Sequence, residues 1–294
     1  MPLYRTIVCA IDFSDHSKKA LHLAAGLAAR LGARVYAVHV IDFLLAEAAA
    51  AAYDVKRLKA DAGTELHALV AEVTGSDANV EVAVRVGRAD HEILACAATA
   101  GADVIAMGTQ GLGGVRKLLF GSVTEKVLRS VKVPVLATPH RPGQPLAHPG
   151  IGAVVVGLDL EDESEAVAAQ AAALASALGV PLTLMHAIPH GPLAPYAVEV
   201  YGQAVGTLRS QAERKMEAIA LPFAKQLAVT TEVRLGSPAD ELAALAGAQP
   251  NALAVIGLGG KGLFHRPGST AYRVLSLADT PVLAVPARRA DAAG

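Results

Sequence analysis

The sequence predicts an α/β protein made of two tandem repeats, each a five-stranded parallel sheet flanked by helices. The chain has 294 residues, and at a prior of about 150 residues per domain this length suggests two domains. The segment Thr6–Asp12 recurs as Ala153–Asp159, which lies 147 residues later. Hydrophobic residues make up 53% of the chain and aromatic residues only 4%, so two aliphatic cores are possible.

The elements of the first half have counterparts in the second half. The run that ends at Gly32 has helical spacing, and so does its counterpart that ends at Gly179. Short apolar runs rich in Val and Ile are typical of strands buried on both faces, and their alternation with helices predicts parallel sheets with right-handed crossovers. The matched strands are Thr6–Asp12 with Ala153–Asp159, Val35–Val40 with Leu182–Ala187, Val84–Gly87 with Val233–Gly236, Val104–Gly108 with Ala254–Gly257, and Val133–Ala137 with Thr280–Ala284.

The proposed domains are residues 1–140 and 151–288, and the segment 139–150, which contains four prolines and two glycines, is the linker. The fifth strands begin near Pro134 and Pro281, and sheet edges need covering. We therefore expect the two halves to pair through these strands as a pseudo-dimer within one chain. A homodimer of whole chains is a further option.

Composition excludes several classes of function. The net charge of −1 argues against nucleic-acid binding, which needs a basic surface. The stretch from Ala166 to Val198 has no Asp, Glu, Lys or Arg, but glycines and prolines interrupt it, so we expect no membrane span.

Cys9 and Cys96 form no disulfide framework and no metal motif, so we expect both to be buried. No signal peptide is recognisable, which favours the cytoplasm.

A glycine-rich segment follows the fourth strand of the first half, where ligands of open parallel sheets bind. It contains Gly108, Gly111 and the pair Gly121–Ser122, which opens a helix. Glycine lets the backbone approach a ligand, and a helix N-terminus favours a phosphate. The competing interpretations are a plain helix cap at Ser122 and, for Asp12, a cap on the helix that follows it. If Gly121 has a positive φ, its replacement by Ala should weaken ligand binding strongly.

The spacing Gly, two residues, Gly, nine residues, Gly, Ser resembles the fingerprint of the universal stress protein family, and the match covers nearly all of both halves. The resemblance implies a Rossmann-like three-layer sandwich of the adenine nucleotide α-hydrolase-like type that binds ATP, with or without Mg²⁺. It implies a nucleotide-dependent regulator of stress responses with protein partners. The roles of contacting adenine, ribose and phosphates fall on Asp12, Val40, Gly108, Gly111, Gly121, Ser122 and Val123.

The second half departs from this pattern. Only seven residues separate Gly260 from Gly268, and five acids crowd the end of the first strand, from Asp159 to Glu165. A polyphosphate would be repelled there unless Lys261, His265, Arg266 or Mg²⁺ offsets these charges. We expect this second site to bind ATP more weakly than the first site, or not at all. Its candidate residues are Asp159, Gly257, Gly260, Gly268, Ser269 and Thr270.

Two classes of function stay open at this point. One is the ATP-dependent regulator, and the other is an interaction module of the same fold that does not depend on nucleotide. No general base for fast ATP hydrolysis is evident, so catalysis would amount at most to slow ATP hydrolysis or autophosphorylation.

The run Gly257–Gly262 fits a dinucleotide-binding pattern, but Pro267 stands where its helix should continue. His39 and His186 recur at equivalent strand ends, which favours support of the backbone over metal binding.

Overall fold

The computed structural model describes residues 3–43, 47, 54–75, 79–109, 121–139, 150–189, 198–259 and 269–286. The chain divides into two compact units, Met1–Gly150 and Ile151–Gly294. Most of the predicted linker lies outside the described residues, and so do Gly111, Gly260 and Gly268.

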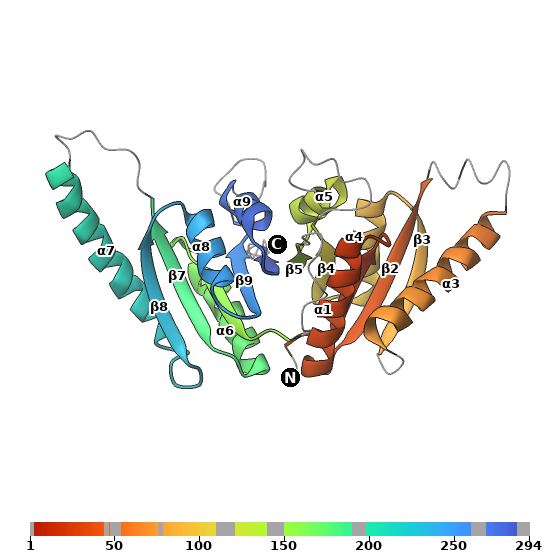
Figure 1. The fold of residues 1–294 in the computed structure, drawn as a ribbon, viewed down its shortest axis with the longest axis horizontal. Coiled ribbons are helices and arrows are strands. Elements are labelled where there is room, and N and C mark those ends of the chain that lie inside the picture. The colour runs from red at the N-terminus through yellow and green to blue at the C-terminus, as the bar shows by residue number, and fades with distance from the viewer. Residues whose placement is uncertain are drawn as a thin grey trace, which may run out of the picture. The chain divides into compact units, whose positions relative to one another are not determined.

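The first unit contains a parallel sheet whose strands lie in the order β3-β2-β1-β4-β5. Strands and helices alternate along the chain, as expected (Figure 1). The elements are β1 (Thr6–Ile11), α1 (Asp15–Leu31), β2 (Arg34–Asp42), α3 (Val55–Thr74), β3 (Val80–Gly87), α4 (Ala89–Ala100), β4 (Val104–Gly108), α5 (Ser122–Ser130) and β5 (Val135–Thr138).

The second unit repeats this topology, with its strands in the order β10-β9-β6-β7-β8 and all of its strand pairs parallel. Its elements are β6 (Ala153–Gly157), α6 (Ser164–Leu178), β7 (Leu182–Ile188), α7 (Val198–Ala220), β8 (Val229–Leu235), α8 (Pro238–Gly247), β9 (Ala252–Gly257), α9 (Ser269–Leu277) and β10 (Val282–Val285). The α/β fold class predicted from the sequence is confirmed in both units.

The strand order reverses next to the first strand of each unit, because β1 pairs with both β2 and β4. With right-handed crossovers, this reversal places α1 and α3 on one face of the sheet and α4 and α5 on the other. The contacts agree, since α1 packs against α3 and α4 packs against α5. In the second unit α8 likewise packs against α9. The point of reversal is where ligands of such sheets bind.

The helix ends match the glycines that predicted them. Gly32 follows α1 with φ 68°, and Gly179 follows α6 with φ 62°, the left-handed conformation that glycine adopts at low cost. The helical spacing in the sequence begins at Lys19 and Ala166, but the helices begin earlier, at Asp15 and Ser164. Of the helices in the described residues, none is both long enough and apolar enough to cross a membrane.

The cores are aliphatic, as the composition predicted. Ile7, Leu21 and Ile105 are among the largest fully buried side chains of the first unit, and Leu174 and Leu253 hold the same place in the second. Dense aliphatic packing of this kind holds the strand ends rigidly, which positions the site described next.

Candidate functional site

The structure brings three of the sequence-predicted residues to one edge of the first sheet. Asp12 follows β1 directly and Gly108 ends β4, and these two strands are neighbours at the point of reversal. Val40 lies in the adjacent β2, one residue beyond His39, which pairs with Ile11 of β1. Val40 was expected to end its strand, but β2 continues to Asp42.

The start of α5 is tied to this edge by two hydrogen bonds. The Gly121 N–H donates to the carbonyl oxygen of Thr109 at 2.9 Å. The Thr124 hydroxyl donates to the carbonyl oxygen of Gly108, also at 2.9 Å. Gly121, Ser122 and Val123, all of them predicted site residues, therefore lie near the end of β4.

Asp12 closes the turn between β1 and α1. Its Oδ1 accepts hydrogen bonds from the Ser14 N–H at 3.1 Å and from the Ser14 hydroxyl at 2.6 Å. Ser14 is the N-cap of α1, because its Oγ accepts from the Ser17 N–H. The interpretation of Asp12 as the cap is therefore wrong. Within the described residues Oδ2 of Asp12 has no hydrogen-bond partner.

The same turn contains strained backbone in both units. Phe13 has φ 64° and Leu160, 147 residues later, has φ 62°, a left-handed conformation that bulky residues rarely adopt. Nδ1 of His39 lies 2.9 Å from the carbonyl oxygen of Ile11, and Nδ1 of His186 lies 2.8 Å from that of Leu158. The prediction that these histidines support the backbone is confirmed.

These histidine contacts also fix the tautomer of each ring. A carbonyl oxygen only accepts, so Nδ1 carries the proton and Nε2 of the neutral ring is left as an acceptor. In the first unit the Phe13 ring lies beside that of His39, with 4.6 Å between the ring centroids.

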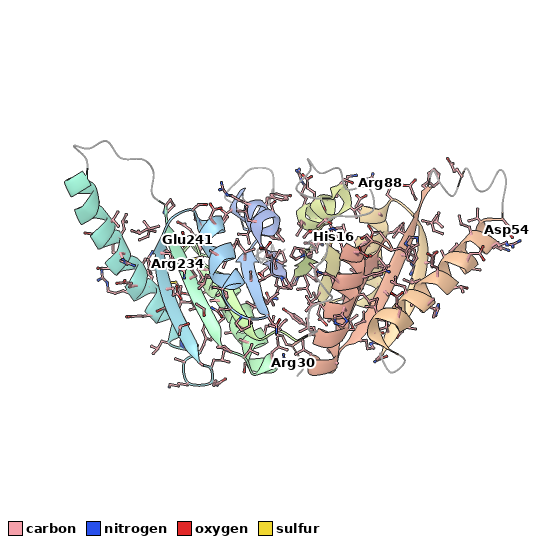
Figure 2. All side chains as sticks on the ribbon, viewed as in Figure 1. His16, Arg30, Asp54, Arg88, Arg234 and Glu241 are labelled. Carbon is pink, nitrogen blue, oxygen red and sulfur yellow. The ribbon has the colours of Figure 1, made fainter. Side chains whose placement is uncertain are left out.

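The structure explains one glycine of the fingerprint, Gly108, and corrects the expectation for another, Gly121. A Cβ on Gly108 would lie 2.6 Å from His16 Cβ and 2.8 Å from the His16 carbonyl carbon, so α1 requires glycine there. Figure 2 labels His16 on α1. Gly121 has φ −67° and ψ 138° and is the N-cap of α5. A positive φ at Gly121 is therefore excluded, and Ser122 is the first helical residue instead of the cap.

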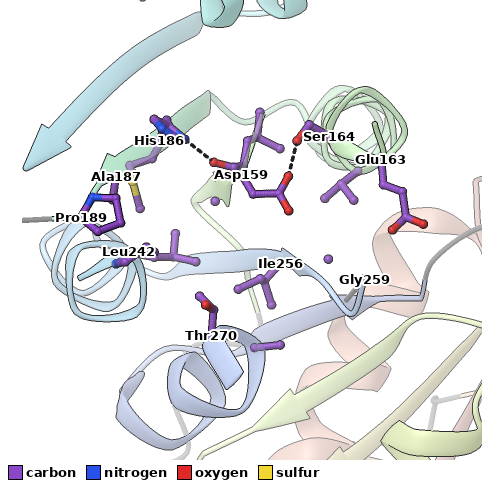
Figure 3. Close-up of a pocket in the computed structure, with 17 residues that line it drawn as sticks. Asp159, Glu163, Ser164, His186, Ala187, Pro189, Leu242, Ile256, Gly259 and Thr270 are labelled. Carbon is purple, nitrogen blue, oxygen red and sulfur yellow. Dashed lines mark hydrogen bonds between the residues drawn. The ribbon is translucent and has the colours of Figure 1, made fainter. Parts of the chain in front are cut away.

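The second unit has a cavity of about 310 Å³ at the corresponding edge, between the ends of β6, β7 and β9 (Figure 3). This volume is at the lower end of the range for small-molecule sites. Of the predicted residues of the second site, Asp159, Gly257 and Thr270 line this cavity, and Ser269 begins α9. The cavity is also lined by Glu163, one of the five acids noted in the sequence, by His186, which was expected only to support the backbone, and by Leu242, which the sequence did not single out.

Asp159 is held as Asp12 is, through one of its two carboxylate oxygens. Its Oδ1 accepts from the Ser164 hydroxyl at 2.7 Å and from the Glu161 N–H at 3.0 Å. In contrast to α1, α6 begins without a side-chain cap, since its N-cap position is Glu163. The two sites therefore have the same backbone conformation at this turn but differ in the polar groups around it.

The two cysteines take no part in these sites. Both are free and buried, and burial raises the pKa of the Cys9 thiol far above its usual value. Burial also raises the pKa of Cys96, although nearby Arg85 opposes the shift. The described residues contain no group of three His, Cys, Asp or Glu side chains placed to hold a metal ion.

Comparison with protein families supplies the classification. The model of the universal stress protein family matches residues 3–139 and again residues 150–286. This chain belongs to the universal stress protein family. It carries two universal stress protein domains in tandem.

Universal stress proteins of several organisms are similar to this chain. A Methanocaldococcus jannaschii universal stress protein is 32% identical over 46% of this chain and 81% of its own length. One from Mycolicibacterium smegmatis is 27% identical over 95% of this chain and 96% of its own length. The crystal structure of a universal stress protein from Archaeoglobus fulgidus has a TM-score of 0.63 at 20% identity, covering 97% of this chain and 98% of that one.

Proposed function

We propose that the first unit of this universal stress protein binds ATP and that the nucleotide regulates the protein in a stress response. The observation that carries the proposal is Oδ2 of Asp12. It belongs to a rigidly held carboxylate at the point of strand reversal, and it has no partner within the described residues. A carboxylate oxygen in that place accepts a hydrogen bond from a ligand amino or hydroxyl group.

The start of α5 supplies the complementary part of the site. Among the residues that the structure describes, no side chain caps this helix, which leaves the N–H groups of Ser122 and Val123 for phosphate oxygens. The helix dipole adds a favourable interaction with negative charge. We include Gly111 in the proposed site because the family resemblance implies it. The resemblance likewise implies that Val40 contacts the adenine. Mg²⁺, if it accompanies ATP, would be held mainly by the phosphates.

The regulatory part of the proposal includes protein partners and the pseudo-dimer of the two domains. It does not include nucleic acid, a membrane or fast catalysis, and it places the protein in the cytoplasm. Slow hydrolysis of ATP or autophosphorylation is compatible with it. Native mass spectrometry of freshly purified protein reports bound nucleotide and subunit number together, and nucleotide that copurifies with the protein would support the proposal.

A second candidate function is an interaction module that needs no nucleotide. The observation in its favour is that packing against His16 is enough to require Gly108, so this part of the fingerprint does not need a ligand. Absence of binding at millimolar ATP would favour the interaction module.

Replacement of Asp12 by Asn separates the role of this residue in the turn from its role toward a ligand. Asn keeps an Oδ1 that accepts from Ser14, but its amide group replaces the Oδ2 acceptor with a donor. Loss of one charge-assisted hydrogen bond costs about 1.5–3 kcal/mol. We therefore expect Asp12→Asn to weaken ATP binding by about tenfold or more, since about 1.4 kcal/mol corresponds to a factor of ten.

Calorimetric titration of ATP measures this effect, and thermal unfolding should show little change in the melting temperature. Asp159→Asn is the matched control, because it makes the same change in the second unit. Equal weakening of the tightest ATP-binding step by both variants would contradict the placement of the main site in the first unit.

A further inference from the structure

At one pair of equivalent positions beside the two candidate sites, the first unit has a histidine and the second unit has a glutamate. Glu163 precedes α6, and the residue 147 positions earlier is His16 of α1. Glu163 lines the cavity of the second unit, and a Cβ on Gly259 would overlap its carboxylate (Figure 3). His16 lies against Gly108 at the end of β4. Both side chains therefore adjoin the backbone where the glycine segment of their unit begins.

The charge of Glu163 is uncompensated within the described residues, where its carboxylate makes no hydrogen bond and no ion pair. Its neighbours add to the negative charge, because Asp159, Glu161, Asp162 and Glu165 lie within four residues of it. The corresponding segment 12–18 of the first unit contains Asp12, Asp15 and Lys18. A phosphate group that entered the cavity of the second unit would therefore meet repulsion, which water and salt weaken because these carboxylates are exposed.

The remaining walls of the cavity suit the uncharged part of a nucleotide. Val167, Met185, Leu242 and Ile256 provide an apolar surface for a flat ring. Asp159 and the Nε2 of His186 provide acceptors for amino and hydroxyl groups. A ligand that offers donors and no negative charge matches this arrangement.

We propose that the second unit binds a purine nucleoside without phosphates and that Glu163 determines this specificity by excluding phosphate. The proposal rests on the proposed function, since it assumes that the family's nucleotide site persists in both units. It makes the two domains of one chain sensors of different ligands, a phosphorylated nucleotide in the first and its dephosphorylated form in the second.

Methionine methyl groups give a separate reporter for each unit in the full chain. Met185 lines the cavity of the second unit, and Met107 directly precedes Gly108 in the first unit. The chain has four methionines, so ¹³C-methyl NMR spectra of labelled protein are simple to assign. Adenosine and ATP are titrated separately into the wild type and into the variants Glu163→Gln and Glu165→Gln.

In the wild type we expect adenosine to shift the Met185 signal at concentrations at least tenfold below those that ATP requires. Glu163→Gln should reduce this preference at least tenfold, because it removes the charge while keeping the size of the side chain. Glu165→Gln removes the same charge from a residue that is exposed as Glu163 is but does not line the cavity, so it should change the preference less than threefold.

Equal binding of ATP and adenosine at Met185 in the wild type would overturn the proposal, and so would an unchanged preference in Glu163→Gln. Failure of both ligands to move Met185, while ATP moves Met107, would overturn it and leave the proposed function of the first unit intact. If neither ligand moves either methionine, both the proposal and the proposed function fail.

Discussion

Asp12 and Asp159 each use one carboxylate oxygen, Oδ1, to hold a turn at the end of the first strand of their unit. The residue that follows each of them has a positive φ, which costs about 1–3 kcal/mol when the residue is not glycine. His39 and His186 hold the strained turn in place through the preceding carbonyl group. Strained backbone at the same place in both repeats is typical of functional sites.

The contact between Gly108 and His16 gives a prediction about stability. In Gly108→Ala the new Cβ would lie 2.8 Å from a backbone carbon of α1, so the helix must shift. Overpacking of this kind costs about 1–3 kcal/mol, and chemical denaturation should show that loss of stability.

Gly63→Ala is the control for this prediction. Gly63 lies within α3, and its Cβ would meet only Val84 Cγ2 at 3.9 Å. Alanine is favoured over glycine in a helix by about 0.5–1 kcal/mol, so we expect this variant to be more stable than the wild type. A Gly108→Ala protein as stable as the wild type would contradict the packing explanation.

At the scale of elements, the helix that follows the first strand begins differently in the two units. Ser14 caps α1, whereas α6 begins at Ser164 without a side-chain cap and with acids on both sides of its start. Acidic side chains near a helix N-terminus stabilise it by about 0.3–1 kcal/mol. The acids of the second unit therefore stabilise α6 at the same time as they repel phosphate.

The ion pair between α8 and α9 gives a prediction about pH. A hydrogen bond from Ser237 and then the nearby Arg273 hold the pKa of Asp240 below its usual value, although desolvation opposes them. Arg273 donates to Oδ2 of Asp240 at 2.9 Å. A carboxyl group with a lowered pKa stabilises the fold above its unfolded pKa and loses that contribution as the pH falls through its folded pKa.

We therefore expect Asp240→Asn to be slightly less stable than the wild type at neutral pH. The difference should disappear as the pH is lowered below 3.8, the usual value for aspartate. Thermal unfolding across this range measures it. Asp61→Asn, at an exposed residue of α3, should show no such convergence, and a gap between Asp240→Asn and the wild type that persists at low pH would refute the assignment.

At the scale of the whole molecule, one chain contains two copies of the same domain fold. Each unit places an aspartate at the end of its first strand and a supporting histidine on the neighbouring strand. Duplication frees one copy to change its polar groups while the other keeps them. The fold is therefore shared between the units, and specificity is expected to differ between them.

The predicted pseudo-dimer can be tested on the fifth strands, β5 and β10. If the halves pair through them, hydrogen exchange should be slow for all amides of Val135–Thr138 and Val282–Val285. An open edge strand leaves alternate amides unpaired, so fast exchange at every second residue would contradict the pairing.

The sequence by itself determined the repeat, the order of strands and helices and the glycines that end α1 and α6. These features depend on local periodicity and on the conformational preferences of single residues, both of which are legible along the chain. It also identified Asp12, Gly108 and their counterparts Asp159 and Gly257 as residues at the carboxyl ends of strands.

Only the tertiary structure decided why those residues are needed and what surrounds them. Gly108 is required by His16, which lies 92 positions earlier in the chain, and Glu163 reaches the cavity of the second unit beside Gly259. The left-handed turns at Phe13 and Leu160 exist although both residues disfavour them. Such features arise from packing between residues distant in sequence, and no local pattern of residue types encodes that packing.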